Sequence, residues 1–545
     1  MWRQAKETGR REEYEDFDKK VKKMIRRAKS KFEKKLAEGG NSKPFYAYLK
    51  KRTKGRAAVG PLKDENRKII TEDGEMAEVL NRFFSSVFTR DVDGQDGGGE
   101  RDNPPNQPPR MGRMVITEAE VRKKIRKLRK EAAAGPDEMG PRLLQELENE
   151  IAWPLTIIFR ASLVRGEVPD DWRTANVTPI FKKGSKADPG NYRPVSLTSV
   201  CCKIMESMIR DQMMSHLESH GLINESQHGF MNGRSCCTNL LEFLETVTDT
   251  LDKGGAMDII FLDFAKAFDK VPRERLLRKV AAHGINGQVV RWIGAWLSNR
   301  RQRVVLNGKA STWMEVLSGV PQGSVLGPIL FLLFINDLDG AARLLDTLKK
   351  FADDTKMGKK VATEQDAAEM QRALDEMCRW ADRWGMSFNV AKCKVMHVGH
   401  NNPGFDYKMG GVTLQTTSEE RDIGVTMAKN LKTGAQCKKA ARTAQTVLAQ
   451  LTRAFHFRDR HTFVKLYKTY VRPHLEFAVP AWAPTTREDI ECLEKVQKRA
   501  VGMVSGLKGR DYESRLLELG MVTLEERRHQ IDINRHTRYC TERTK

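Results

Sequence analysis

The sequence predicts a mixed α+β fold, and three features of the chain support that prediction. Between Trp172 and Val425, short β-rich runs alternate with helical ones, which is typical of an α+β domain. After Leu431 the spacing of apolar residues becomes almost wholly helical. Lys19 to Leu36 also has helical spacing, with apolar side chains about one turn apart. Because 545 residues are too many for a single compact core, we expect two or three domains.

Composition divides the chain into four regions. We expect residues 1–90 to form a basic, largely helical N-terminal extension, because the first 60 residues contain 20 Lys and Arg but 8 Asp and Glu. Residues 91–113 are rich in Gly, Pro and polar residues, which predicts a flexible linker. Residues 114–430 carry the mixed α+β pattern, and residues 431–545 should form a helical C-terminal part.

The net charge of +23 predicts a polyanionic partner, because Lys and Arg that neutralise phosphates release condensed counterions. We expect the basic N-terminal extension to face nucleic acid, with a merely solvated helix as the alternative. No membrane partner is expected, because the longest apolar run, Val325 to Phe334, contains Gly327 and Pro328 and falls far short of the ~20 residues that span a bilayer. The charged start predicts no signal peptide, and nine irregularly spaced cysteines suit a reducing, intracellular compartment.

Two acidic segments suggest a catalytic site. The apolar run Ile259 to Leu262 has the length of a strand and ends at Asp263, where a buried charge is costly unless it is paired or binds metal. Asp353 and Asp354 lie between flanks compatible with two strands, where a hairpin would turn. Adjacent carboxylates repel each other, so a bound cation would hold them ionised. The pair Asp170-Asp171 lacks such flanks and is expected in an exposed turn, so an acidic pair alone is weak evidence.

Several short motifs surround these acids in a definite order. They are Gly135-Pro136-Asp137, Asn191 to Leu197, Gln227 to Phe230, Asp263 to Asp269, Gly319 to Ser324, Phe351 to Asp354, Asn389 to Cys393, Ile423 to Val425 and Tyr470 to Glu476. Over residues 30–540 this order resembles the reverse transcriptases of non-LTR (LINE-type) retrotransposons, nearest to jockey-like and chicken-repeat-like elements. Phe351 departs from the usual Tyr of that family, and Glu138 from the usual Gly.

The resemblance implies a right-hand polymerase, with fingers, a palm built on an antiparallel sheet and a helical thumb. It implies an RNA-directed DNA polymerase that extends a DNA 3′-hydroxyl on an RNA template from deoxynucleoside triphosphates. Asp263 and Asp353 would bridge two Mg²⁺ ions, with Asp354 beside them and with Mn²⁺ as a substitute metal. The protein would work as a ribonucleoprotein in the nucleus and cytoplasm.

The resemblance also implies roles at the incoming nucleotide. Phe268 would be the steric gate against a 2′-hydroxyl, although ordinary core packing is the alternative for its ring. Lys392 resembles the lysine that protonates the leaving pyrophosphate. His228 is expected to be structural. The remaining candidates would contact the nucleotide or its triphosphate: Arg193, Lys182, Gln322 and Gly323.

Three alternatives stay open at this level. An intron maturase-like reverse transcriptase would share the same chemistry, but the thumb-like segment favours the retrotransposon branch. A decayed or domesticated element protein would only bind RNA or DNA, although all three acids are present. A structural packaging protein would explain the charge but not the ordered motifs. The sequence shows neither an endonuclease-like region nor a zinc-knuckle pattern, which suggests the polymerase portion of a longer protein. It leaves the oligomeric state, the template and the target site open.

Overall fold

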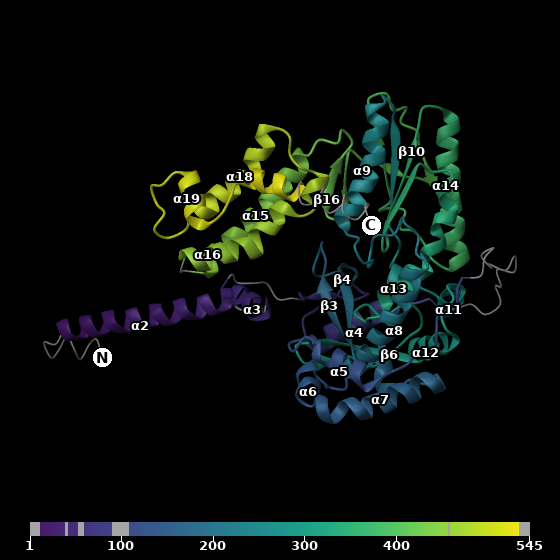
Figure 1. The fold of residues 1–545 in the computed structure, drawn as a ribbon, viewed down its shortest axis with the longest axis horizontal. Helices are drawn as coiled ribbons and strands as arrows, with labels where there is room; N and C mark the ends of the chain where they lie inside the picture. Colours follow the sequence, from purple (N-terminus) through teal and green to yellow (C-terminus); the bar gives the residue numbers. More distant parts are fainter. Residues whose placement is uncertain (1–10, 39–41, 53–58, 90–107, 456–457, 533–545) are drawn as a thin grey trace. The chain divides into compact units, whose positions relative to one another are not determined.

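The computed structural model describes residues 11–38, 42–52, 59–89, 108–455 and 458–532, and the chain forms two compact units (Figure 1). Unit 1 combines residues 1–56 with 419–545, and unit 2 comprises residues 57–418. The mixed helix and sheet content confirms the predicted α+β class. No helix in the described ranges is both long and apolar enough to cross a membrane.

One sheet of unit 2 has five strands in the order β14-β11-β5-β10-β9. Its central strand β5 is antiparallel to both neighbours, and Ile259 and Ile260 are fully buried within it. Figure 1 shows the helices α9 and α14 flanking this sheet. The bounds are β5 Met257–Leu262, β9 Thr347–Phe351, β10 Asp354–Lys360, β11 Lys394–Val398, β14 Gln415–Thr416, α9 Cys236–Asp252 and α14 Glu364–Trp384.

A second sheet of unit 2 has the order β4-β3-β6-β7, with β8 also pairing with β6. Helix α4 packs on β6, and its Leu80 is fully buried together with Leu62 of the small hairpin β1–β2. This packing places residues 59–89 in unit 2, although composition suggested that they continue the N-terminal extension. The bounds are β1 Leu62–Lys63, β2 Ile69–Ile70, α4 Asp73–Ser85, β3 Thr174–Phe181, β4 Tyr192–Thr198, β6 Arg300–Leu306, β7 Lys309–Ala310 and β8 Met314–Val316.

Helices enclose the main core of unit 2, in which Trp292, Trp296 and Phe331 are fully buried. Of the linker expected at 91–113, residues 91–107 lie outside the described residues. The remainder is packed, because Met111 is buried and its N–H donates to the Gly284 carbonyl at 2.8 Å. The helices are α5 Glu118–Arg126, α6 Pro141–Glu146, α7 Glu148–Arg165, α8 Val200–Ser219, α10 Ala267–Lys270, α11 Arg273–Ala282, α12 Gly287–Leu297 and α13 Gly327–Phe334.

Unit 1 joins the two ends of the chain through stacked aromatic rings. Phe45 stacks on Tyr470 at a centroid distance of 3.9 Å and on Phe455 at 5.6 Å. The predicted helix over Lys19 to Leu36 is confirmed within α2. Apart from the hairpin β15–β16, the described part of unit 1 is helical, as expected after Leu431. The bounds are α2 Arg11–Glu38, α3 Ser42–Arg52, β15 Glu419–Asp422, β16 Val425–Ala428, α15 Gly434–Ala454, α16 Arg460–Leu466, α17 Arg472–Glu476, α18 Arg487–Val501 and α19 Tyr512–Leu519.

Candidate active site

Asp353 lies in the tight turn that joins β9 to β10. Phe351 pairs with Asp354 in the antiparallel register, so the turn consists of Ala352 and Asp353. Ala352 adopts a left-handed conformation with φ +56°, which a non-glycine residue adopts only where its surroundings hold it. The predicted hairpin is therefore confirmed, with Asp353 at its tip and the exposed Asp354 at the start of the returning strand.

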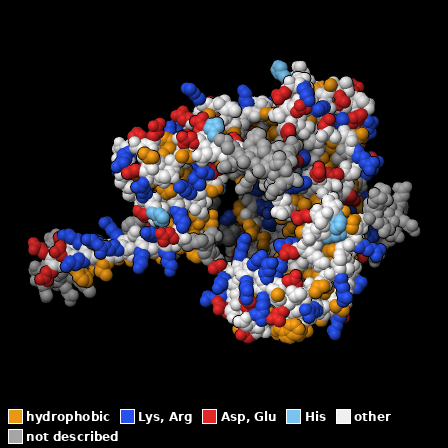
Figure 2. All heavy atoms as spheres, in the orientation of Figure 1, with side chains coloured by type: hydrophobic (Ala, Val, Ile, Leu, Met, Phe, Trp, Pro, Cys, Tyr) orange, Lys and Arg blue, Asp and Glu red, His pale blue; other side chains and the backbone are white. Residues whose placement is uncertain are grey.

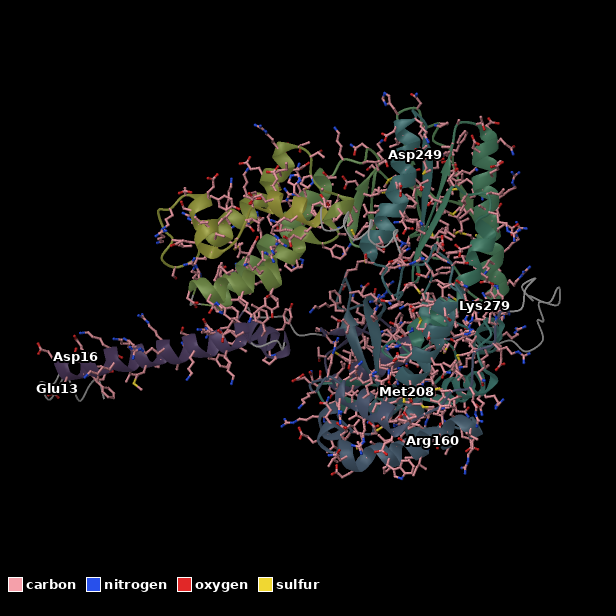
Figure 3. All side chains as sticks on the ribbon, in the orientation of Figure 1. Glu13, Asp16, Arg160, Met208, Asp249 and Lys279 are labelled. Carbon is pink, nitrogen blue, oxygen red and sulfur yellow. The ribbon has the colours of Figure 1, made fainter. Side chains whose placement is uncertain are left out.

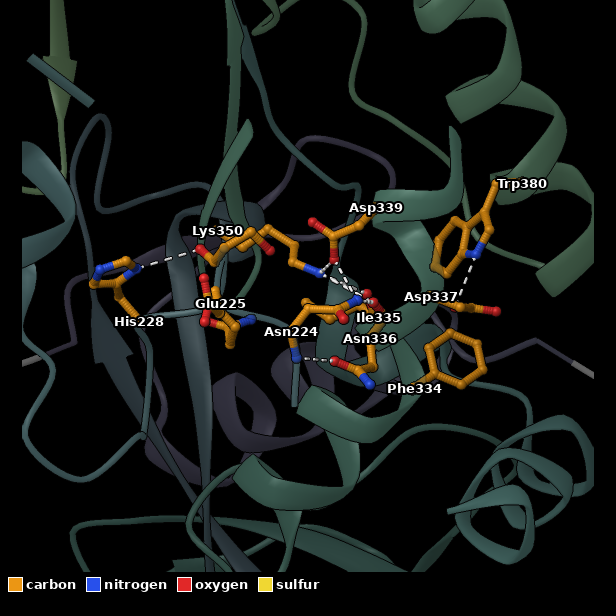
Figure 4. Close-up of polar contacts among 12 residues, drawn as sticks. Asn224, Glu225, His228, Phe334, Ile335, Asn336, Asp337, Asp339, Lys350 and Trp380 are labelled. Carbon is orange, nitrogen blue, oxygen red and sulfur yellow. Dashed lines mark hydrogen bonds and ion pairs between the residues drawn. The ribbon is translucent and has the colours of Figure 1, made fainter. Parts of the chain in front are cut away.

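The segment 227–229 holds this turn in place. The Gln227 side-chain oxygen accepts hydrogen bonds from the backbone N–H of Gly229 at 2.7 Å and from that of Ala352 at 3.0 Å. A Cβ at position 229 would lie 2.4 Å from the Ala352 nitrogen, so only glycine fits there. The His228 N–H donates to the Lys350 carbonyl at 2.9 Å (Figure 4). These backbone contacts show how the motif Gln227 to Phe230 supports the acidic turn.

A buried polar network lies beneath the hairpin. The Lys350 side chain is fully buried and its ammonium donates to Asp339 and to the carbonyls of Ile335 and Asn336 (Figure 4). Burial lowers the pKa of Lys350, and the neighbouring Asp339 carboxylate opposes that shift. The His228 ring is buried as well and bonds Glu242 at 3.0 Å, an arrangement that agrees with the structural role expected for it.

Asp263 follows the last residue of β5, as the sequence predicted. Leu262 pairs with Thr355 of β10, so the end of β5 lies beside the start of β10 and its two acids. The Lys392 ammonium donates to the Asp263 carboxylate at 3.0 Å, and the Asn389 N–H donates to the Asp263 carbonyl at 2.7 Å. The segment after α14 therefore supplies a cation to this carboxylate.

The electrostatics link Asp353 to Asp263. Burial raises the pKa of Asp353, and the nearby Asp263 carboxylate raises it further, whereas Arg193 and Lys182 oppose the shift. Two carboxylates that repel each other in a partly buried site are stabilised in their ionised forms by nearby positive charge. Lys392, which pairs with Asp263, provides part of it.

The donor set suits a hard divalent cation. Among the described residues, no three His, Cys, Asp or Glu side chains converge closely enough to hold a metal ion alone. Mg²⁺ does not need such a cage, because it commonly binds one or two carboxylates together with water and substrate phosphates. The oxygen donors of Asp263 and Asp353, with Asp354 at the edge, fit that mode of binding, and substrate oxygens would complete the coordination.

Phe268 lies on the short helix α10, five residues after Asp263. Its ring stacks on the fully buried Phe331 of α13, with a centroid distance of 4.4 Å and an interplanar angle of 19°. One face of the ring is therefore packed, while the side chain as a whole is only half-buried. This geometry is compatible with a gate as well as with a core residue.

The turn containing Gln322 and Gly323 is attached to both α10 and β4. The Gln322 amide donates to the Asp269 carboxylate at 2.9 Å, and the Gln322 carbonyl accepts from the Ser196 N–H at 2.7 Å. Gly323 has φ +113°, and a Cβ there would lie 2.6 Å from the Ser196 carbonyl oxygen. Glycine is required here by the close approach of β4, a reason that the sequence alone did not supply.

Cations gather around these acids. Burial lowers the pKa of Lys182, and repulsion from Arg193 and Lys266 lowers it further. Lys266 was not among the candidates. Its pKa is lowered, first by burial, and it interacts with Asp269 and Lys392. Its place inside the motif that begins at Asp263 was the signal that could have identified it. The result is an electropositive neighbourhood suited to a polyphosphate.

Asp269 was also missed as a candidate. Burial raises its pKa, and the Gln322 hydrogen bond together with Lys266, Lys182 and Arg193 opposes that shift. It therefore connects helix α10, the turn at Gln322 and Gly323, and the group of cations. The structure brings together Asp263, Asp353, Lys392, Arg193, Lys182, Lys266, Asp269 and Gln322.

Comparison with known proteins shows which protein family the sequence around this site matches. Residues 180–434 match the family described as reverse transcriptase (RNA-dependent DNA polymerase). This range begins at the end of β3 and includes β4, β5 and the β9–β10 hairpin. Residues 180–434 therefore resemble a reverse transcriptase domain.

Similarity to individual proteins narrows the class to LINE-type elements. The chain is 27% identical over 416 residues to the RNA-directed DNA polymerase from mobile element jockey of Drosophila funebris, covering 73% of this chain and 45% of that protein. It is 25% identical over 390 residues to the probable RNA-directed DNA polymerase from transposon X-element of Drosophila melanogaster, covering 69% and 42%. The chain thus resembles LINE-type reverse transcriptases and spans less than half the length of these relatives.

Proposed function

We propose that this chain is the RNA-directed DNA polymerase of a non-LTR retrotransposon. It extends a DNA 3′-hydroxyl on an RNA template from deoxynucleoside triphosphates. The observation that carries the proposal is the meeting of Asp263 and Asp353, from segments 90 residues apart, within a group of Lys and Arg side chains. Two carboxylates beside a site for polyphosphate are what metal-assisted phosphoryl transfer requires.

The proposal assigns the parts of a right-hand polymerase to the two units. The five-stranded sheet with Asp263 and Asp353 is the palm, and the β3–β4–β6 sheet with its helices belongs to the fingers. The helices of unit 1 supply the thumb. The basic helix α2 and the charged faces of unit 1 bind template and primer through their phosphates, so binding falls as salt rises.

The proposal assigns a role in the reaction to each residue of the site. Asp263 and Asp353 would hold two divalent ions, which would supply positive charge to the primer hydroxyl and to the leaving pyrophosphate. Asp354 would lie beside them and tune the site. Arg193, Lys182 and Lys266 neutralise the triphosphate, and Lys392 donates a proton to pyrophosphate. Gln322 and Gly323 form the backbone surface against the base and sugar, and Phe268 occupies the space that a 2′-hydroxyl would need.

Primer extension tests the proposed function directly. Purified protein, freed of nucleic acid, should extend a labelled DNA primer on an RNA template when Mg²⁺ is present. EDTA should abolish the product, and excess Mg²⁺ or Mn²⁺ should restore it, because the carboxylates alone cannot neutralise the developing charge. Tight binding of the primer–template with no extension in either metal would contradict the polymerase and indicate a protein that only binds nucleic acid.

Gly323→Ala should lower both stability and nucleotide affinity. The new methyl group would strain a positive φ and press on the Ser196 carbonyl, which together should cost about 1–3 kcal/mol. We expect the KM for deoxynucleotide to rise about tenfold as the turn shifts, since such a shift costs about 1.4 kcal/mol of binding. The measurements are a melting curve and steady-state primer extension.

Gly308→Ala is the matched control for this change. Gly308 also has a positive φ of +84°, but a Cβ there meets no atom within 4 Å. It should reproduce the backbone strain without moving a neighbouring strand, so only the melting temperature should fall. Equal effects of the two substitutions on KM would show that the contact with β4 does not position the nucleotide.

A further inference from the structure

The outer face of α7 carries exposed apolar side chains along most of its length. Trp153, Ile157 and Val164 are 51%, 49% and 57% exposed, and Ile158 lies on the same face. Figure 2 shows hydrophobic side chains gathered along the lower edge of unit 2, where Figure 1 places α6 and α7. Arg160, labelled in Figure 3, comes from the same helix, and its guanidinium lies 5.9 Å from the centre of the Trp153 ring.

The inner face of α7 packs against the hydrophobic core of unit 2. Leu155, Phe159 and Leu163 are buried in the main hydrophobic cluster of unit 2. A helix with apolar side chains on two opposite faces is normally covered on both faces, because exposed apolar surface is costly in water. A contiguous exposed patch of this kind marks an interaction surface. Leu143 and Leu147, also exposed, extend the patch over α6 and its end.

The charges at the two ends of α7 indicate what covers it. Glu150 lies in the first turn and Arg165 in the last, both exposed and both on the apolar face by helical spacing. Neither forms a salt bridge within the part of the chain that the structure describes. If two copies of α7 lie antiparallel, Glu150 of each meets Arg165 of the other. Ile157 and Ile158 then lie at the centre.

We propose that α7 is the interface of a symmetric homodimer, with a second copy of this chain as the occupant. The contact is isologous, so each copy contributes the same face and the two-fold axis passes near Ile157 and Ile158. An 18-residue helix is ~27 Å long, and two such helices pack 8–10 Å apart, so the interface is at the small end for stable dimers. The expected dissociation constant is therefore micromolar.

Sedimentation velocity of the full chain, freed of nucleic acid, tests this interface over about 0.5–50 μM, a range that brackets a micromolar dissociation constant. Ile158→Asp places two carboxylates near the axis and should raise the dimer dissociation constant by at least about thirtyfold. Leu517→Asp is the matched control, because Leu517 on α19 is 84% exposed and lies in unit 1, and it should leave the dimer unchanged. Melting curves verify that both variants fold.

A charge exchange makes the test specific to the antiparallel arrangement. Glu150→Arg alone and Arg165→Glu alone should each weaken the dimer several-fold, because each creates two like-charge contacts. The double variant should recover the wild-type dissociation constant, and a mixture of the two single variants should form heterodimers. A chain that remains monomeric throughout, or a dimer unaffected by Ile158→Asp, would overturn the proposal. So would a double variant no better than the single ones.

Discussion

Asp353→Asn is expected to reduce RNA-templated primer extension by at least about a thousandfold. Asparagine keeps the size of the side chain but removes the charge on which metal binding depends, and losing a bridging ligand raises the barrier by several kcal/mol. Burial raises the pKa of Asp353, so the ionised carboxylate destabilises the folded protein at neutral pH. The neutral variant should therefore melt at the same temperature as the wild type or higher.

The measurement is a single-turnover extension rate beside a melting curve. Asp170→Asn is the control, because Asp170 belongs to the other acidic pair and lies exposed in a 3-10 turn. That variant should extend primers at the wild-type rate. A folded Asp353→Asn protein with an unchanged rate would eliminate the two-metal assignment, whereas a lost rate with a lowered melting temperature would mean that the substitution disrupts the hairpin.

Phe268→Val is expected to raise ribonucleotide incorporation about a hundredfold relative to deoxynucleotide. A gate ring excludes the 2′-oxygen by occupying its space, and removing such a clash is worth a few kcal/mol, with each 1.4 kcal/mol giving about a tenfold change. The ring also stacks on Phe331, so the truncation should cost about 1–3 kcal/mol of stability as well. The readout that separates the two roles is the ratio of kcat/KM for the two sugars.

Phe264→Val supplies the comparison for this change. Phe264 lies on the same segment, is buried, and stacks on Phe388 at a centroid distance of 4.3 Å. Its truncation should lower the melting temperature without altering the preference for the deoxy sugar. If Phe268→Val lowers only the melting temperature and preserves that preference, then Phe268 is a packing residue and the gate lies elsewhere.

The sequence by itself determined the local framework of the site. An apolar run of strand length ending at Asp263 predicted β5, and the flanks of Asp353 predicted a hairpin. Both are confirmed, because hydrophobic spacing and turn position act over a few residues and can be identified from neighbours in the chain. The ordered motifs likewise indicated a reverse transcriptase, and residues 180–434 match that family.

Only the tertiary structure decided which distant segments meet. Lys266 and Asp269 were missed because their environment comes from Lys182, Arg193 and Gln322, which lie on other elements. The requirement for glycine at 323 likewise arises from the approach of β4. Charge, burial and close contact at these positions depend on spatial proximity, which no local pattern encodes.

The same reason explains the division into units. Composition grouped residues 1–90 together, but Phe45 stacks on Tyr470 while Leu80 is buried in unit 2. Local sequence shows the charge of a segment and its helical spacing. The compact unit to which a segment belongs depends instead on which distant apolar faces it packs against. The outer face of α7 differs in the opposite way, because it is exposed although its sequence is apolar. Its sequence has the apolar content of a buried helix, and only the fold shows that Trp153, Ile157 and Val164 are exposed among the described residues.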